Sequence, residues 1–120
     1  MNGKQILIVD DNNLILEIME QQIELFHPEH RVVLAQDGFA ALDNFKREPF
    51  DLVVTDYQMP GMTGLDLAAN IRRLSPQIPI VLMSGDLLEA ETKSKTQKLT
   101  LDGYLEKPIV WDQFWTLVSK

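Results

Sequence analysis

The sequence contains no cysteine, and this absence removes several kinds of chemistry at once. Without thiols there are no disulfides, no thiolate metal sites and no cysteine nucleophile. The longest apolar runs, such as residues 6–9, are far too short to cross a bilayer. The first residues also lack a basic segment followed by a long apolar stretch, so they do not read as a signal peptide. We therefore expect a cytoplasmic protein with no membrane contact.

Basic residues are also few, because 11 Lys and Arg stand against 18 Asp and Glu and leave a formal net charge of −7. A protein that binds duplex DNA normally needs a basic face, so we expect no direct nucleic-acid binding. An acidic surface instead suits cations or basic partner surfaces. The 120 residues, 45% of them hydrophobic, are enough for one domain spanning residues 1–120 and too few for two.

Five short apolar runs, mostly continuous rather than alternating, indicate strands that are buried on both faces. They span residues 6–9, 31–35, 52–55, 80–83 and 104–105. Helix-length stretches with apolar residues near helical spacing follow them at residues 13–26, 39–47, 65–73, 87–98 and 110–120. This alternation predicts an α/β fold, in which right-handed crossovers build a parallel sheet that is covered on both faces.

Chemically capable side chains follow four of the five predicted strands. In open parallel sheets the ligand lies outside the carboxyl ends of the strands, so these side chains should share one edge. They are Asp10, Asp11, Asp56, Ser84 and Lys107. Three crowded carboxylates repel one another unless a cation binds between them. Because the ligands are all oxygen atoms, a hard divalent cation is implied, Mg²⁺ first and Mn²⁺ as an alternative.

A metal ion, a lysine and a hydroxyl group together can stabilise a phosphoryl group during its transfer. Aspartate is itself a known nucleophile toward phosphorus and forms an aspartyl phosphate. Asp56 is the candidate acceptor, because it stands alone on the middle strand between the acidic pair and the Ser84 and Lys107 side chains.

Four segments carry a resemblance that covers essentially the whole chain. They read ILIVDD at 6–11, DLVVTDYQMPGMTG at 51–64, PIVLMSG at 79–85 and GYLEKP at 103–108. In this order and at these separations the sequence resembles the receiver domains of two-component response regulators, of the chemotaxis-regulator-like kind. The resemblance implies a flavodoxin-like doubly wound (βα)5 fold with a five-stranded parallel sheet of strand order 2-1-3-4-5.

The resemblance also implies roles for the residues at the strand ends. Asp56 resembles the phosphoacceptor, and Lys107 resembles the lysine that contacts the phosphoryl group. Asp10 and Asp11 resemble the acidic pair that holds Mg²⁺, with Asp11 closer to direct coordination. Asp56 and the backbone carbonyl of Gln58 complete the expected metal ligands.

Three further residues resemble parts of a conformational switch. Ser84 corresponds to the hydroxyl that moves onto the phosphoryl group, and Tyr104 to the aromatic side chain that then rotates inward. Gln58 and Asp86 lie where relatives tune the lifetime of the phosphoryl group. The bond between Lys107 and Pro108 is expected to be cis, as in relatives.

The function implied is a signalling switch that catalyses only its own phosphorylation and dephosphorylation. The expected phosphodonor is a sensor histidine kinase or a histidine phosphotransfer protein, within a phosphorelay. The expected output partner, a target protein or an output domain, contacts the face formed by residues 87–98, 104–105 and 110–120. A phosphorylation-dependent dimer stays open, as does the choice between a stand-alone receiver and part of a larger regulator or hybrid kinase.

Other functions compete with this interpretation. The same acidic cluster could serve a hydrolase or phosphatase, although no substrate pocket or Asp-x-Asp nucleophile motif is evident. A flavodoxin-like cofactor binder would share the fold, but no Gly-rich phosphate loop follows the first strand. An unphosphorylated docking module is the fourth class, and it is disfavoured because all the expected catalytic positions are filled.

Several residues also have purely structural interpretations. Asp10 and Asp11 could cap the helix that begins near residue 13. Trp111 and Trp115 could shield the edge of the core or form an aromatic stripe facing a partner. Tyr104 could be static core packing. His27 and His30 flank Pro28 in a polar loop, where we expect neither a metal site nor a phosphorylated histidine. The polar residues 87–98 suggest a loosely packed helix.

Overall fold

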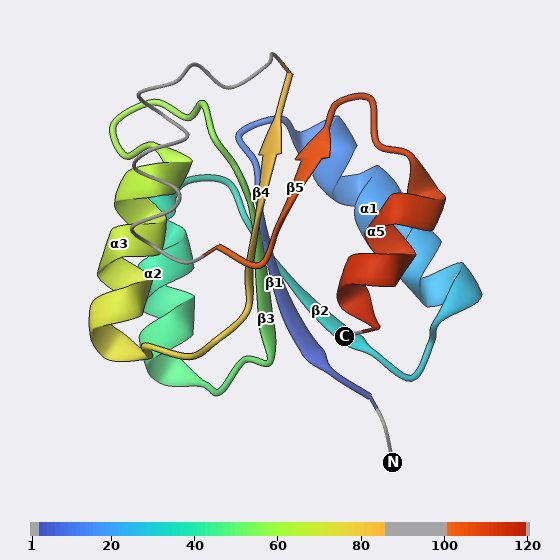
Figure 1. Ribbon diagram of the computed structural model, residues 1–120, viewed down its shortest axis with the longest axis horizontal. Helices are drawn as coiled ribbons and strands as arrows, with labels where there is room; N and C mark the ends of the chain where they lie inside the picture. The colour runs from blue at the N-terminus through green and yellow to red at the C-terminus, as the bar shows by residue number, and fades with distance from the viewer. Residues whose placement is uncertain (1–2, 86–100, 120) are drawn as a thin grey trace.

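The computed structural model describes residues 3–85 and 101–119 (Figure 1). Its elements are β1 (Gln5–Val9), α1 (Asn13–Phe26), β2 (Arg31–Ala35), α2 (Gly38–Arg47), β3 (Leu52–Asp56), α3 (Gly64–Leu74), β4 (Ile80–Ser84), β5 (Gly103–Glu106) and α5 (Trp111–Val118). The helix expected at residues 87–98, and with it the prediction that it is loosely packed, lies outside the described residues. In the described part of the chain, no helix combines the length and the apolar content needed to cross a bilayer.

The five strands form one parallel sheet in the order β2-β1-β3-β4-β5, which confirms the predicted α/β class and strand order. The order reverses at β1, which pairs with β2 on one side and with β3 on the other. Val9 is in register with Thr55, so the next residues, Asp10 and Asp56, leave adjacent strands at the same edge. The sheet topology therefore creates the crevice in which such folds bind their ligands.

Helices cover both faces of the sheet, with α1 and α5 on one face and α2 and α3 on the other (Figure 1). Each face has its own core cluster, and alternate residues of β1 belong to different clusters: Ile6 and Ile8 to one, Leu7 and Val9 to the other. All four side chains are fully buried. Because both faces of the strand are covered, its apolar run is continuous rather than alternating.

Polar side chains at the helix starts specify where α1 and α3 begin. Asn12 caps α1, and its side-chain oxygen accepts hydrogen bonds from the backbone N–H groups of Leu14 and Ile15. Thr63 and Asp66 form a reciprocal capping box at α3. The suggestion that Asp10 and Asp11 cap the first helix is therefore wrong, since that position belongs to Asn12. Capping of α1 therefore does not explain the presence of Asp10 and Asp11.

The two tryptophans of α5 shield the core. Trp111 and Trp115 are half-buried and pack against the cluster that contains Phe114. The ring centroid of Trp115 lies 5.1 Å from that of Phe114 and 4.7 Å from that of His27. These contacts favour the core-shielding interpretation of the pair, because both rings pack against neighbouring rings and core residues of the same domain.

Candidate functional site

Eight residues line a cavity of about 540 Å³ at the carboxyl edge of β1 and β3. They are Asp10, Asp11, Asn12, Ile15, Asp56, Gln58, Gly85 and Lys107. They come from four separate parts of the chain: the junction between β1 and α1, the end of β3 with the loop after it, and the residues that follow β4 and β5. The expectation that side chains at the strand ends share one edge of the sheet is confirmed for Asp10, Asp11, Asp56 and Lys107.

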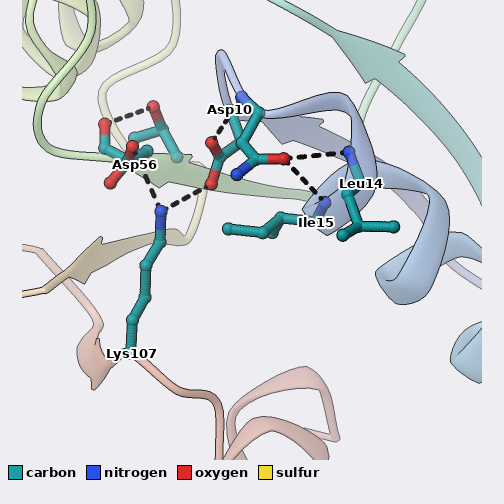
Figure 2. Close-up of polar contacts among 7 residues, drawn as sticks. Asp10, Leu14, Ile15, Asp56 and Lys107 are labelled. Carbon is teal, nitrogen blue, oxygen red and sulfur yellow. Dashed lines mark hydrogen bonds and ion pairs between the residues drawn. The ribbon is translucent and has the colours of Figure 1, made fainter.

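The Lys107 ammonium bridges two carboxylates of this cavity, as Figure 2 shows. Its Nζ lies 2.8 Å from Asp10 Oδ2 and 3.2 Å from Asp56 Oδ2. The segment that carries it is held against β4, since the backbone N–H of Lys107 donates to the carbonyl of Ser84 at 2.8 Å. The Lys107–Pro108 peptide bond is cis, as predicted.

Asp10 uses both of its oxygens within the protein. Oδ2 receives the Lys107 ammonium, and Oδ1 accepts the backbone N–H of Asn12 at 2.9 Å. Its side chain is fully buried, whereas Asp11 is exposed to solvent. Asp10 is thus fixed in position, and Asp11 is the solvent-exposed carboxylate of the pair that lines the cavity.

One carboxylate oxygen from each of Asp10, Asp11 and Asp56 lies within 4.8 Å of the others, close enough for all three to share a metal ion. A fit to a hard divalent cation follows from the donor chemistry, because every candidate ligand is an oxygen and two of the three carboxylates are buried. One ammonium group cannot neutralise three carboxylates, so a cation would also relieve their remaining repulsion.

The electrostatics of Asp56 reflect this crowding. Burial raises the pKa of the Asp56 carboxyl, and the negative charge of Asp10 raises it further, while Lys107 acts in the opposite direction. For Lys107, burial lowers the pKa, but the hydrogen bond from its ammonium to Asp10 and the charges of Asp10 and Asp56 outweigh burial and raise it. The lysine therefore stays charged, and Asp56 is a carboxylate under strain from its neighbours.

The loop after β3 holds the main chain of Asp56 in place. The Thr55 hydroxyl donates to the Asp56 carbonyl at 3.0 Å. A Cβ atom on Gly64 would lie only 2.1 Å from the same carbonyl oxygen, so only glycine permits this approach. Gly61, in the same loop, has a φ of 82°. Both glycines therefore serve the conformation and close packing of the main chain.

The remaining predicted site residues lie at varying distances from this centre. Gln58 lines the cavity and is exposed, and Ser84 is half-buried at the end of β4. Tyr104 lies on β5 with 47% of its surface exposed, so the interpretation as static core packing is wrong. Asp86 lies outside the described residues.

Sequence reasoning missed three residues that line the cavity. Asn12, Ile15 and Gly85 each lie next to a predicted site residue or one helical turn beyond it. The preference of asparagine for the position before a helix could have identified Asn12. Nothing in the sequence pattern distinguishes Ile15 from an ordinary apolar residue of an amphipathic helix. Its place in the cavity lining depends on how α1 packs against the sheet.

A second group of potential ligands lies in the loop between α1 and β2. Oxygen and nitrogen atoms of His27, Glu29 and His30 come within 4.8 Å of one another. However, Nδ1 of His30 accepts the backbone N–H of Lys4 at 2.9 Å, so neutral His30 carries its proton on Nε2, the nitrogen that faces Glu29. Metal-bound histidines use their second ring nitrogen as a donor, and this arrangement opposes a metal site.

Comparison with known proteins assigns the class. Residues 6–119 match the family model described as the response regulator receiver domain. Among solved structures, the receiver domain protein of Methanospirillum hungatei JF-1, described as CheY-like, superposes with a TM-score of 0.90 at 25% identity, covering 98% of this chain and 92% of that one. A receiver protein from Pseudomonas putida superposes with a TM-score of 0.89 at 25% identity, covering 99% and 98%. The chain belongs to the response regulator receiver domain family, and it is a receiver domain of two-component signalling.

Curated relatives place such domains within much longer proteins. The autoinducer 1 sensor kinase/phosphatase LuxN of Vibrio campbellii is 39% identical over 86% of this chain and 12% of that protein. The sensor protein GacS of Pseudomonas syringae pv. syringae is 36% identical, covering 97% of this chain and 13% of that protein. The transcriptional regulatory protein ZraR of Klebsiella oxytoca is 30% identical over 100% of this chain and 27% of that protein. The chain thus spans about a quarter or less of each.

Proposed function

We propose that this domain accepts a phosphoryl group on Asp56 from a phosphohistidine donor, in a reaction that depends on Mg²⁺. The observation that carries the proposal is the Lys107 ammonium, which lies between the carboxylates of Asp10 and Asp56 at 2.8 Å and 3.2 Å. A buried carboxylate that can act as the nucleophile lies here beside a lysine ammonium and the acidic pair Asp10 and Asp11. This arrangement suits phosphoryl transfer.

Asp10, Asp11 and Asp56 would hold the divalent cation, with the backbone carbonyl of Gln58 as a further ligand. When bound, Mg²⁺ (or Mn²⁺) supplies positive charge that offsets the charge of the phosphoryl oxygens. Lys107 supplies a second positive charge from the protein itself. Because Asp10 is already held by Asn12 and Lys107, we assign direct coordination to the exposed Asp11 carboxylate.

In the transfer step, a carboxylate oxygen of Asp56 attacks phosphorus as the bond from phosphorus to the donor histidine nitrogen breaks. The imidazole leaves with the electron pair of that bond, and the product is an aspartyl phosphate. The carboxylate must be ionised to attack, so the neighbours that raise the pKa of Asp56 oppose the reaction while Lys107 supports it. Small phosphodonors with good leaving groups can replace histidine in the same step.

The phosphoryl group then biases a two-state equilibrium. Ser84 moves its hydroxyl onto the phosphoryl oxygens, and the exposed Tyr104 ring turns inward behind it. Gln58 and Asp86 adjust how long the phosphoryl group persists. The partners are a sensor histidine kinase or histidine phosphotransfer protein on the input side and an output domain or target protein on the other, and the setting we propose is the cytoplasm.

Incubation with Mg²⁺ and acetyl phosphate tests the acceptor assignment. Intact-mass spectrometry should show one added phosphoryl group on the wild-type protein and none on Asp56→Asn. Asp51→Asn is the matched control, because Asp51 precedes the opposite end of the same strand, where it accepts the backbone N–H of Gln5. Labelling of Asp56→Asn at the wild-type level, or a requirement for Asp51, would show that the acceptor is wrongly assigned.

A further inference from the structure

Ile15 lies in the first turn of α1, where it borders two hollows of different character. The first is the carboxylate cavity, in which Ile15 contributes the one apolar side chain among the described lining residues. The second is an apolar hollow of about 280 Å³ between α1 and the segment that follows β5, where Ile15 lies with Pro108, Ile109 and Trp111. Ile15 and Lys107 line both hollows, and Ile15 is the apolar side chain at the boundary between the carboxylate cavity and the apolar groove.

The direction of the side chain supports this placement. Figure 2 shows Ile15 extending toward the contact between Lys107 and Asp10, whereas its neighbour Leu14 points away from it. Ile15 is half-buried and packs against a core cluster, while Leu14 is 63% exposed. Adjacent residues on one helical turn thus differ in whether they reach the cavity.

The position of Ile15 bears on the hydrolysis of a phosphorylated Asp56. An aspartyl phosphate is lost when a water oxygen attacks phosphorus and the bond from phosphorus to the Asp56 oxygen breaks. The products are the free carboxylate and inorganic phosphate, and the proton of the water passes to solvent. The carboxylates, amides and ammonium around Asp56 can all hydrogen-bond a water molecule, but an aliphatic side chain cannot.

We infer that Ile15 is a water-excluding wall of the phosphoryl site, which slows hydrolysis of the aspartyl phosphate and so sets part of its lifetime. The inference rests on the proposed phosphorylation of Asp56. Removing the branched end of the side chain opens room beside polar groups that can hold a water, and such a site hydrates readily. A polar replacement would go further and help to orient that water.

The test compares decay rates after phosphorylation with acetyl phosphate and Mg²⁺ and rapid removal of the donor. The fraction of phosphoprotein is followed by intact mass for the wild type, Ile15→Ala, Ile15→Gln, Ile15→Leu and Leu14→Ala. We expect Ile15→Ala and Ile15→Gln to lose the phosphoryl group about threefold to tenfold faster than the wild type. Ile15→Leu keeps an apolar side chain at this position and should lose the phosphoryl group at a rate within about twofold of the wild type. Leu14→Ala should lose it at the wild-type rate.

The outcomes separate the wall from a merely structural role. Thermal melting and its shift with Mg²⁺ are measured for each variant, so Ile15→Gln carries the test should Ile15→Ala fail to fold. Decay of both variants at the wild-type rate, or equal acceleration by Leu14→Ala, would overturn the inference and leave the proposed function standing. A wild-type protein that takes up no phosphoryl group would overturn the proposed function and this inference together.

Discussion

At the scale of single residues, the domain keeps a carboxylate where a carboxylate is costly. Asp56 is 6% exposed, and its nearest charged neighbours include a second buried aspartate. Burial and the charge of Asp10 raise the pKa of Asp56. A folded-state pKa above the unfolded one means that Asp56 supports folding below the ordinary aspartate pKa of about 3.9, and that this support is lost as pH rises through the folded value.

Replacing Asp56 with asparagine should therefore stabilise the protein at pH 7 when divalent cations are absent. We expect Asp56→Asn to raise the free energy of unfolding by about 1 kcal/mol, a few degrees in melting temperature, because a neutral amide avoids the cost of burying a charge and the repulsion by Asp10. Urea or thermal unfolding in EDTA measures the difference.

The gain should shrink as pH falls through the raised pKa of Asp56, because the wild-type carboxyl is then protonated. Asp43→Asn, an exposed change on α2, is the control and should leave stability unchanged at pH 7. If Asp56→Asn is less stable than the wild type in EDTA, the Asp56 carboxylate contributes favourable contacts that outweigh its burial.

At the scale of elements, the start of β1 is tied to the loop before β2 through a histidine. The backbone N–H of Lys4 donates to Nδ1 of His30, whose side chain is 9% exposed, and the N–H of Arg31 donates to the Lys4 carbonyl. Burial lowers the pKa of His30, the charges of His27 and Lys4 lower it further, and Glu29 opposes them. Protonation at Nδ1 would also break the bond from Lys4.

The stability that His30 contributes should therefore be lost in mild acid. Because its folded pKa lies below the unfolded one, the contribution is complete above the unfolded pKa of about 6.5 and disappears as pH falls through the folded value. His30→Asn keeps an acceptor for the Lys4 N–H without titrating in this range. Between pH 7.5 and pH 5, the wild type should lose about 1 kcal/mol relative to His30→Asn.

Urea unfolding across this pH range measures the difference between the two proteins, and it cancels the titration of groups they share. His27→Asn is the matched control in the same loop and should show most of the wild-type loss, since the burial of His30 and its bond from Lys4 stay intact there. Parallel pH profiles for the wild type and His30→Asn would show that protonation of His30 does not cause the loss of stability in mild acid.

The elements themselves were largely predictable because both faces of the sheet are covered. In β1 and β4, four consecutive residues are buried, so their apolar runs predict the bounds of these strands to within a residue at each end. The sequence indicates that α1 begins at residue 13, but it leaves Asp10 and Asp11 as possible caps and does not identify Asn12. Capping depends on backbone geometry at one residue, and three adjacent polar residues that can all cap leave that choice open.

At the scale of the whole molecule, parallel topology explains why most of the site could be predicted. Strand ends share one edge, and the order reversal at β1 brings Asp10 next to Asp56, so a rule about topology replaces knowledge of coordinates. The contribution of Ile15 could not be predicted, since it depends on how α1 packs beside the cis Lys107–Pro108 segment. The sequence separation between these parts leaves no local pattern to detect.

The divalent cation proposed for the three gathered carboxylates would also stabilise the entire fold, because it would offset repulsion in a protein with a net charge of −7. A ligand that binds only the folded state raises the free energy of unfolding by about 2.7 kcal/mol when its free concentration is 100 times its Kd. We therefore expect Mg²⁺ at that level to raise the wild-type melting temperature by roughly 10 °C over EDTA. Asp11→Asn should lose most of this shift, because it removes the exposed ligand.

Differential scanning calorimetry in Mg²⁺ and in sodium chloride of equal ionic strength separates site binding from general screening, which also relieves repulsion on an acidic surface. Asp11 is exposed, so in EDTA its replacement should leave the melting temperature close to that of the wild type. Loss of the Mg²⁺ shift without loss of basal stability is the signature of a ligand for the cation. An equal shift in sodium chloride, or an undiminished shift in Asp11→Asn, would place the cation elsewhere on the acidic surface.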